Sequence, residues 1–167
     1  YKSIYLTRLL TEAGADILPV LTKGACRFVG PLSLSALSGH RAVTDLWSSA
    51  QAGEIGHVEW AHQADLLVIA PATANTIAKL ALGLADDPLS AIALSTQAPI
   101  LIAPAMEDGM WNNPATAAHI QTLTERGIMI APPHGGALAS GRSGMGRMME
   151  PEHLLETISS VLTPTDW

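Results

Sequence analysis

The chain has 167 residues, of which 48% are hydrophobic and 14% are charged, and its formal net charge is −6. A chain of this length can bury the core of one domain, and its acidic balance argues against a nucleic-acid partner, which would need clustered Lys and Arg. No apolar run approaches the ~20 residues that span a bilayer, and no secretory leader is visible. The single cysteine, Cys26, excludes an internal disulfide and fits a reducing compartment, so we expect a cytoplasmic protein without membrane contact.

The elements predicted in chain order alternate between helices and short apolar strands. Residues 1–13 have the apolar spacing of a helix, which Gly14 ends. The continuous apolar runs typical of strands buried on both faces are Ile17–Leu21, Leu66–Ala70, Ile100–Ala103 and Ile128–Ala131. The helical patterns between and after these runs are His57–Ala64, Thr76–Leu84, Asp87–Thr96, Pro114–Arg126 and Pro151–Leu162.

This alternation predicts an α/β fold, namely a doubly wound parallel sheet of the flavodoxin-like or Rossmann-like kind in a three-layer sandwich. Such a fold starts with an inner strand and a Gly-rich turn, whereas this sequence starts with a helical pattern. We therefore expect that the first strand is missing from the sequence, which would leave two inner strands with unpaired edges. We assign residues 1–162 to one domain and residues 163–167 to the start of a possible linker.

Two loops that directly follow predicted strands carry candidate binding residues. Residues 71–76 read Pro-Ala-Thr-Ala-Asn-Thr, and such a turn presents backbone N–H and hydroxyl groups to a phosphate or a flat polar ring. Residues 104–111 follow the next strand and contain two methionines and a tryptophan. The two loops together predict a ligand site. The first could also be a helix cap without a ligand, and the second a turn that packs at a subunit interface.

Five motifs in one order carry a resemblance to a known family. They are residues 56–59 (Gly-His-Val-Glu), 71–76, 83–87 (Gly-Leu-Ala-Asp-Asp), 104–116, and 139–141 with 144–148. On these motifs the whole chain resembles the flavin-dependent cysteine decarboxylases, whose best-known member acts on 4′-phosphopantothenoylcysteine in coenzyme A synthesis. The resemblance implies FMN as cofactor and decarboxylation of that substrate to 4′-phosphopantetheine.

The resemblance also implies which residues contact FMN. The family's first Gly-rich flavin loop would precede Tyr1 and has no counterpart in the sequence. The remaining FMN contacts fall on Thr22, Lys23, Gly24, Thr73, Ala74, Asn75, Thr76 and Ala105. In the family, FMN takes two electrons from the substrate cysteine, which creates the electron sink that lets CO2 leave.

The catalytic histidine of the family corresponds to His57, whose imidazole can change charge near neutral pH. The other interpretation is that His57 only caps or packs on its own helix beside Glu59 and Trp60. The substrate-contacting positions implied by the family are Glu107, Met110, Ala137, Leu138 and Ala139. No metal-ligand spacing is found among the histidines, so we expect no metal.

Two positions depart from the family's pattern. Glu107 stands where the family has asparagine, and an ionised carboxylate accepts but cannot donate a hydrogen bond to the carboxylate that leaves. Either Glu107 is protonated, or another donor serves, or the substrate differs. Ser140 stands at the catalytic position where family members that release a saturated aminothiol carry the proton-donating cysteine. The nearby glycines predict a flexible flap, in which Arg142 and Arg147 could meet a substrate phosphate.

Several functions and partners therefore remain open. The leading hypothesis is the FMN-dependent decarboxylase; the alternatives are a non-catalytic or regulatory flavoprotein subunit, a peptidyl-cysteine decarboxylase that releases an enethiol, and a flavoprotein reductase. We expect a homo-oligomer, a trimer or a multiple of it, with the flavin between protomers. The resemblance also implies a fused or separate phosphopantothenate–cysteine ligase as a possible partner.

Overall fold

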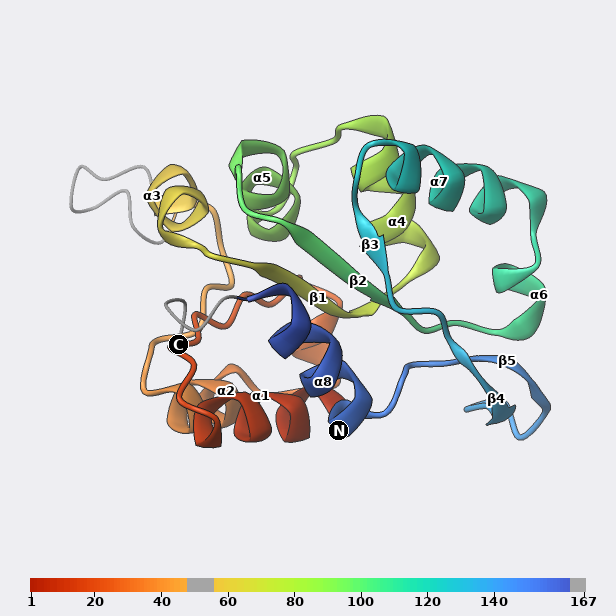
Figure 1. Ribbon diagram of the computed structural model, residues 1–167, viewed down its shortest axis with the longest axis horizontal. Helices are drawn as coiled ribbons and strands as arrows, with labels where there is room; N and C mark the ends of the chain where they lie inside the picture. The colour runs from red at the N-terminus through yellow and green to blue at the C-terminus, as the bar shows by residue number, and fades with distance from the viewer. Residues whose placement is uncertain (48–55, 163–167) are drawn as a thin grey trace.

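The computed structural model describes residues 1–47 and 56–162, so the predicted linker at residues 163–167 lies outside the described residues. Figure 1 shows the order of the elements along the chain. The helices are α1 (Lys2–Glu12), the 3-10 turn η1 (Ala25–Arg27), α2 (Pro31–Ser38), α3 (Gly56–Gln63), α4 (Ala74–Leu82), α5 (Pro88–Ser95), α6 (Asp108–Trp111), α7 (Pro114–Glu125) and α8 (Pro151–Val161). The strands are β1 (Leu67–Ala72), β2 (Ile100–Pro104), β3 (Met129–Ile130), β4 (His134–Ala137) and β5 (Ser143–Arg147).

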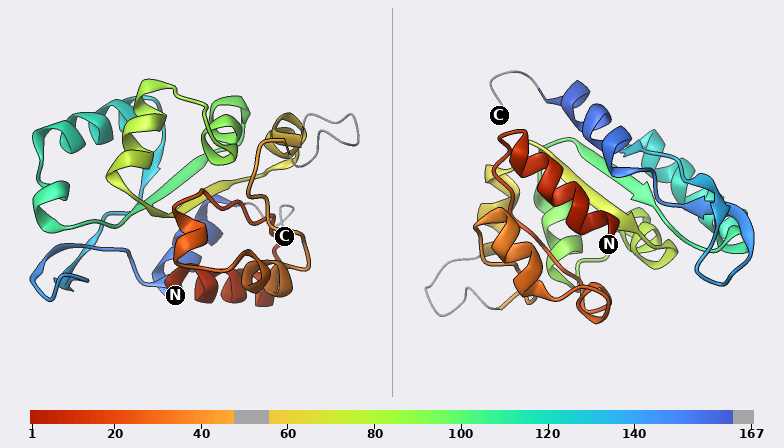
Figure 2. Two further views of the ribbon diagram at one scale, coloured as in Figure 1. Left: turned by 180° about the vertical axis from the view of Figure 1, so that it is seen from behind. Right: turned by 90° about the horizontal axis from the view of Figure 1, so that it is seen from below.

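A parallel sheet with helices on both faces forms the centre of the molecule, as the alternating pattern predicted. Its strand order is β1-β2-β3, and β2 pairs with β1 in the register Val68 to Leu101. Helices α1 and α8 cover one face, and α4, α5 and α7 lie on the other (Figures 1 and 2). The predicted α/β fold is therefore confirmed. Within the described ranges, no helix has the length and hydropathy needed to cross a membrane.

The side chains of β2 alternate between two hydrophobic clusters. Leu101 packs with Leu154 and Ile158 of α8, whereas Ile102 packs on the opposite face with helices α4, α5 and α7. These side chains are almost completely buried, and continuous apolar strands are expected wherever both faces of a sheet are covered. A third cluster lies under α2, and Cys26 packs against it, as expected for a small hydrophobic residue.

The strand predicted at Ile17–Leu21 is wrong in extent, because the structure has only an isolated parallel bridge between Val20 and Val43 there. Two backbone hydrogen bonds of 2.8 Å, from the Leu21 amide to the Val43 carbonyl and from the Val43 amide to the Pro19 carbonyl, hold the bridge. An apolar run forms a strand only where a neighbour pairs with it along its length. In the described part of the chain, β1 likewise has a strand neighbour on one side only.

Local capping explains where the predicted boundaries moved. Helix α4 starts at Ala74 rather than Thr76, because the Thr73 hydroxyl accepts the Thr76 amide, and it ends at Gly83 in the left-handed conformation. Helix α2 was not predicted, although Pro31 at its first turn follows Gly30 in the way helices often begin.

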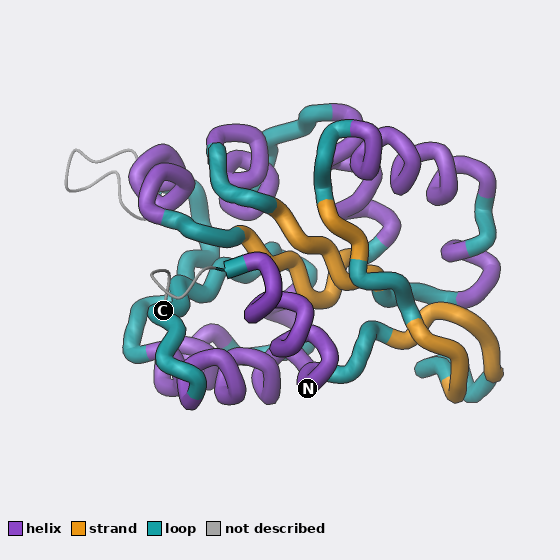
Figure 3. Tube along the Cα trace, viewed as in Figure 1, coloured by secondary structure: helices purple, strands orange, loops and turns teal. Residues whose placement is uncertain are grey.

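The predicted glycine-rich flap is an antiparallel hairpin of β4 and β5, drawn as a separate pair of strands in Figure 3.

The hairpin is fixed to the loop after β2 by a close backbone approach. The Met106 amide donates to the Gly146 carbonyl at 3.0 Å. A Cβ atom added at Gly146 would lie 1.9 Å from the Met106 carbonyl oxygen, so no side chain fits there. Glycine at this position is what lets the hairpin and the loop lie together.

We expect Gly146→Ala to separate the hairpin from the loop and to lower the free energy of unfolding by about 1–3 kcal/mol, the usual cost of overpacking. Urea unfolding followed by circular dichroism measures the loss. Gly109→Ala is the matched control, because an added Cβ there meets nothing within 4 Å. Equal stability of the two variants would contradict the close approach.

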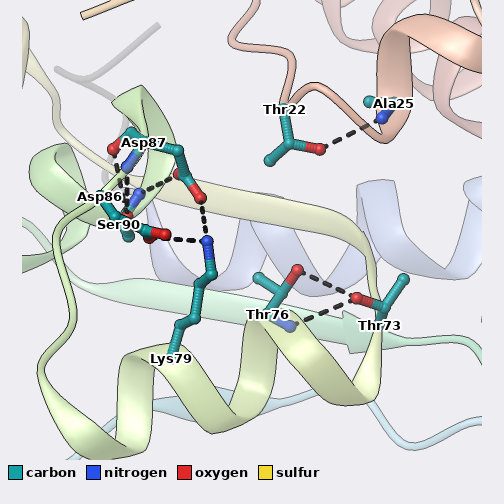
Figure 4. A network of polar contacts seen from close by, with 8 residues as sticks. All are labelled: Thr22, Ala25, Thr73, Thr76, Lys79, Asp86, Asp87 and Ser90. Atoms are coloured by element: carbon teal, nitrogen blue, oxygen red, sulfur yellow. Dashed lines mark hydrogen bonds and ion pairs between the residues drawn. The ribbon is translucent and has the colours of Figure 1, made fainter.

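A charged network ties α4 to α5 and is shown in Figure 4. The Lys79 ammonium lies 2.6 Å from an Asp86 oxygen and 2.8 Å from an Asp87 oxygen, and Asp87 also caps α5 reciprocally with Ser90. The hydrogen bonds that Lys79 donates to Asp86 and, with less effect, to Asp87 raise the pKa of Lys79. Partial burial acts to raise the pKa of Asp87, but its bonds from Lys79 and Ser90 outweigh this and lower it below its ordinary value.

We expect Asp87→Ala to lower the free energy of unfolding by about 1–3 kcal/mol at neutral pH, since a helix cap and a charged hydrogen bond are both lost. Asp86→Ala, the control at the exposed partner, should cost about 1 kcal/mol or less. Because the Asp87 pKa is lowered in the folded state, its contribution is present above the unfolded value and should shrink as the pH falls below about 4. Urea titrations at several pH values measure both effects, and a pH-independent difference would contradict this assignment.

Candidate functional site

The carboxyl ends of β1 and β2 lie side by side and bring the two predicted loops together. Ala72 is paired in register with Pro104, and the Ala105 amide donates to the Ala72 carbonyl at 3.0 Å. The start of α4 at Thr73 therefore adjoins the loop that begins at Ala105. In parallel sheets, this edge is where ligands usually bind.

The first turn of α4 presents several polar groups that have no partner within the described residues. The Thr73 and Thr76 hydroxyls are 3.1 Å apart, and Thr73 caps the Thr76 amide (Figure 4). No acceptor is found in the described part of the chain for the amides of Ala74 and Asn75, or for the exposed Asn75 side chain. The cap therefore satisfies only one of the amides at the start of this helix. The others remain available to an anion or a polar ring.

The predicted residues after the first apolar run lie beside this helix. Val20 packs against the cluster that contains Ile69 of β1 and Ile77 of α4. Thr22 follows two residues later, its hydroxyl accepts the Ala25 amide at 3.2 Å, and Figure 4 shows it in the same close-up as Thr73. Lys23 and Gly24 are exposed at the start of η1.

The loop after β2 is joined to the hairpin by both of its carboxylates. Glu107 caps α6 by position, and one of its carboxylate oxygens accepts the Ser140 hydroxyl at 3.1 Å. Asp108 accepts the Met145 amide at 2.8 Å. Glu107 and Ser140, the two positions that depart from the family's pattern, are therefore in direct contact. Asp108 was missed in the sequence, since nothing local indicates a partner 37 residues away.

The remaining substrate-contacting candidates lie on the same loop and hairpin. Met110 of α6 has 47% of its surface exposed. Ala137 ends β4, and the turn that follows contains Leu138 and Ala139. That turn is closed by a 2.7 Å hydrogen bond from the Leu138 amide to the Arg142 carbonyl. The structure thus groups all five predicted positions around one loop and one hairpin.

His57 is the predicted site residue that the fold does not bring to this group. It is the second residue of α3, is half-buried, and has no hydrogen-bond partner within the described residues. Helix α3 lies against α5, where the Thr96 hydroxyl donates to the Ala61 carbonyl at 2.8 Å. In Figure 1 and in the reversed view of Figure 2, α3 and the hairpin lie at opposite ends of the long axis of the molecule.

The base of the hairpin carries a second charged cluster. Glu150 accepts from Lys2 at 2.9 Å and from Arg147 at 3.1 Å. The Lys2 hydrogen bond, with weaker help from the charge of Arg147, lowers the pKa of Glu150 although desolvation opposes it. Arg147 therefore has a partner within the fold, whereas the Arg142 side chain is exposed at the hairpin tip. No group of three or more His, Cys, Asp or Glu residues suited to a metal is found in the two described ranges.

Known proteins resemble this chain over nearly its whole length. The coenzyme A biosynthesis bifunctional protein CoaBC of Bacillus subtilis is 44% identical over 156 residues, which cover 93% of this chain and 38% of that protein. The same protein of Escherichia coli K12 is 38% identical over 166 residues, which cover 99% of this chain and 41% of that protein. The chain thus spans about two fifths of the length of these curated relatives.

Solved structures with the same fold are also similar in sequence. A PPC decarboxylase mutant complexed with pantothenoylaminoethenethiol is 39% identical, with a TM-score of 0.84 over 94% of this chain and 88% of that one. The FMN-dependent cysteine decarboxylase SpaF is 34% identical, with a TM-score of 0.79 over 95% of this chain and 86% of that one. The sequence pattern of the Flavoprotein family matches residues 1–163. The chain therefore belongs to the Flavoprotein family.

Proposed function

We propose that the chain is an FMN-dependent decarboxylase that converts 4′-phosphopantothenoylcysteine to 4′-phosphopantetheine in coenzyme A biosynthesis. The observation that carries this proposal is its likeness, in sequence and fold, to the PPC decarboxylase that holds an aminoethenethiol compound. The bifunctional CoaBC relatives support the same pathway. Since those proteins are much longer, the proposal concerns the decarboxylase step alone, and a ligase partner, fused or separate, is proposed with it.

The polar edge of the sheet suits FMN. The open amides of Ala74 and Asn75, the Thr73 and Thr76 hydroxyls and the positive end of the α4 dipole match phosphate or ring oxygens. The proposed FMN-binding set is completed by Thr22, Lys23, Gly24 and Ala105, which border the same edge. When bound, FMN supplies the two-electron chemistry that no side chain can provide.

The residues around the loop and the hairpin have proposed roles toward the substrate. Met110 and the segment Ala137–Ala139 contact and orient it, and the closed hairpin turn excludes water from it. His57 acts as the base that takes a proton near the reacting thiol, which its imidazole can do near neutral pH. Among the residues that the structure describes, its half-buried side chain makes no hydrogen bond that would compete with this role.

We propose that the working form is a homo-oligomer, a trimer or a multiple of it, in which one site uses residues of two copies. The separation of α3, which carries His57, from the hairpin of β4 and β5 supports this, because the two elements lie at opposite ends of the molecule. Exposed Phe28 and Leu32, with 91% and 80% of their surface accessible, are apolar groups available to such an interface. We place the enzyme in the cytoplasm, as expected for this pathway.

One observation favours a second candidate function, an enzyme that stops at the enethiol. Ser140 lies where saturated-product enzymes carry an acidic thiol, and a lone hydroxyl is a much weaker acid than a thiol with a pKa of about 8.5. Product analysis distinguishes the two functions, since the saturated thiol is heavier by two hydrogens and lacks the absorbance of the enethiol.

We expect the purified full-length protein to be yellow and to release FMN on denaturation. The double variant Thr73→Ala, Thr76→Ala should bind FMN about 10- to 100-fold more weakly, since each hydroxyl can supply a hydrogen bond to a charged or polar group. Flavin fluorescence titration measures the affinity. Thr122→Ala is the control, because that hydroxyl donates within α7 to the Ala118 carbonyl. Unchanged affinity of the double variant would refute the assignment of the α4 turn.

We expect His57→Asn to lower the rate of CO2 release by about 10²- to 10⁴-fold with FMN retained, the usual effect of losing a general base. Leu138→Gly, which removes a side chain from the hairpin turn, should also lower the rate of CO2 release. Mixed oligomers of the two variants should regain part of the activity, because some sites then receive an intact His57 and an intact hairpin. Absence of any regained activity in verified mixed oligomers would contradict a site shared between copies.

A further inference from the structure

The contact between Glu107 and Ser140 joins the two residues that most distinguish this chain. The Ser140 hydroxyl donates to a Glu107 oxygen at 3.1 Å and accepts the Arg142 amide at 3.4 Å. The two oxygens therefore lie close enough for a proton to pass between them. The neighbouring carboxylate, Asp108, instead accepts the Met145 amide at 2.8 Å.

The position of this contact is fixed from both sides. The Met106 amide, next to Glu107, donates to the Gly146 carbonyl, and Asp108 accepts the amide of the preceding residue of β5, Met145. These two bonds anchor the hairpin strand to the loop at a point where only glycine fits. The exposed hydroxyl–carboxylate contact at the tip therefore joins two segments that are already bonded to each other nearby.

The chemistry of the saturated product requires an acid at this place. Conversion of an aminoethenethiol to the aminothiol adds a proton to the nitrogen-bearing carbon and a hydride to the sulfur-bearing carbon. A serine hydroxyl alone is too weak an acid for the first addition. A carboxyl group is stronger by many orders of magnitude, and a hydroxyl hydrogen-bonded to it can pass its proton on.

We propose that Glu107 and Ser140 act as one proton-transfer pair, in which Ser140 touches the enethiol and Glu107 is the positioning residue that replenishes its proton. For this step the Glu107 carboxyl carries a proton and donates to the Ser140 oxygen, so that the Ser140 O–H is free for the enethiol. The Ser140 O–H bond breaks as a C–H bond forms at the nitrogen-bearing carbon, the Glu107 proton moves to the Ser140 oxygen, and the carboxylate then takes a proton from solvent. When bound, reduced FMN would supply the hydride that the sulfur-bearing carbon needs. This inference rests on the proposed function and assigns the saturated aminothiol as its product.

The first experiment measures the ratio of saturated thiol to enethiol, together with CO2 release, in the FMN-loaded full-length protein given 4′-phosphopantothenoylcysteine. The wild type should form mainly the saturated thiol. Glu107→Gln and Ser140→Ala should each lower the saturated share at least 10-fold, and the double variant should lower it no further, since the pair acts as a unit. Ser140→Cys in the Glu107→Gln background should restore the saturated thiol, because a thiol carries its own acidic proton. Glu125→Gln, which alters a carboxylate bonded only to Gln121 on α7, is the control and should leave the ratio unchanged.

The second experiment tests the hydrogen bond between Glu107 and Ser140 by limited proteolysis, in the absence of catalysis. Trypsin cleaves after Arg142, which is exposed at the hairpin tip two residues from Ser140. In protein without substrate, Glu107→Ala and Ser140→Ala should be cleaved there several-fold faster than the wild type. Glu107→Gln keeps an acceptor for the hydroxyl and should remain within about twofold of the wild type. The glutamine variant thus separates the supply of the proton from the holding of the tip.

Three results would overturn the pair. One is a wild type that releases CO2 but forms only the enethiol, and another is a saturated share that Glu107→Gln leaves unchanged. The third is equal trypsin cleavage in all variants. If the protein releases no CO2, the proposed function fails by itself. The enethiol and chemically reduced FMN are then supplied directly, and loss of the saturated product in Glu107→Gln supports the pair while its persistence refutes it.

Discussion

The parallel pairing of β1 with β2 determines where the two candidate binding loops lie. Because the strands run in one direction with Ala72 opposite Pro104, the segments that follow β1 and β2 leave the sheet at the same edge. One continues into the first turn of α4 and the other into the loop that holds the hairpin. The two hydrophobic clusters on either side of β2 keep this edge in place. The polar turn and the two carboxylates follow from that pairing, because they lie on the segments that leave β1 and β2. The hairpin of β4 and β5 is in turn bonded to the second of these segments.

The sequence predicts those parts of the fold whose cause is local. The apolar runs of β1 and β2 were recognised because strands covered on both faces need continuous hydrophobic residues. Helix α7 was recognised from Asn113 and Pro114, whose capping and first-turn roles the structure confirms. The extent of the Ile17–Leu21 segment was wrong, because pairing depends on neighbours that a single segment does not reveal. The hairpin was missed as a pair of strands, since its glycines show no alternation of apolar and polar residues.

The candidate site divides in the same way. Its loops could be predicted, because a small polar turn after a buried strand is a local pattern with a physical meaning. The contact of Glu107 with Ser140 could not, since 33 residues separate them and neither residue implies the other. The remote position of His57 could not be predicted either, although the expectation of a flavin between protomers is compatible with it. Long-range placement is thus the part of the site that required the structure.

The absence of any room above the Cα atom of Gly146 has an evolutionary consequence. A hairpin and a loop that meet at bare backbone cannot drift independently, because lengthening either one would misalign the meeting point. Residues on the exposed tip can vary freely, and so can the side chains that they face, provided that each replacement comes with a compatible partner. Because the backbone contact at Gly146 fixes the position of the hairpin, paired substitutions at its tip can change the chemistry there without moving the hairpin.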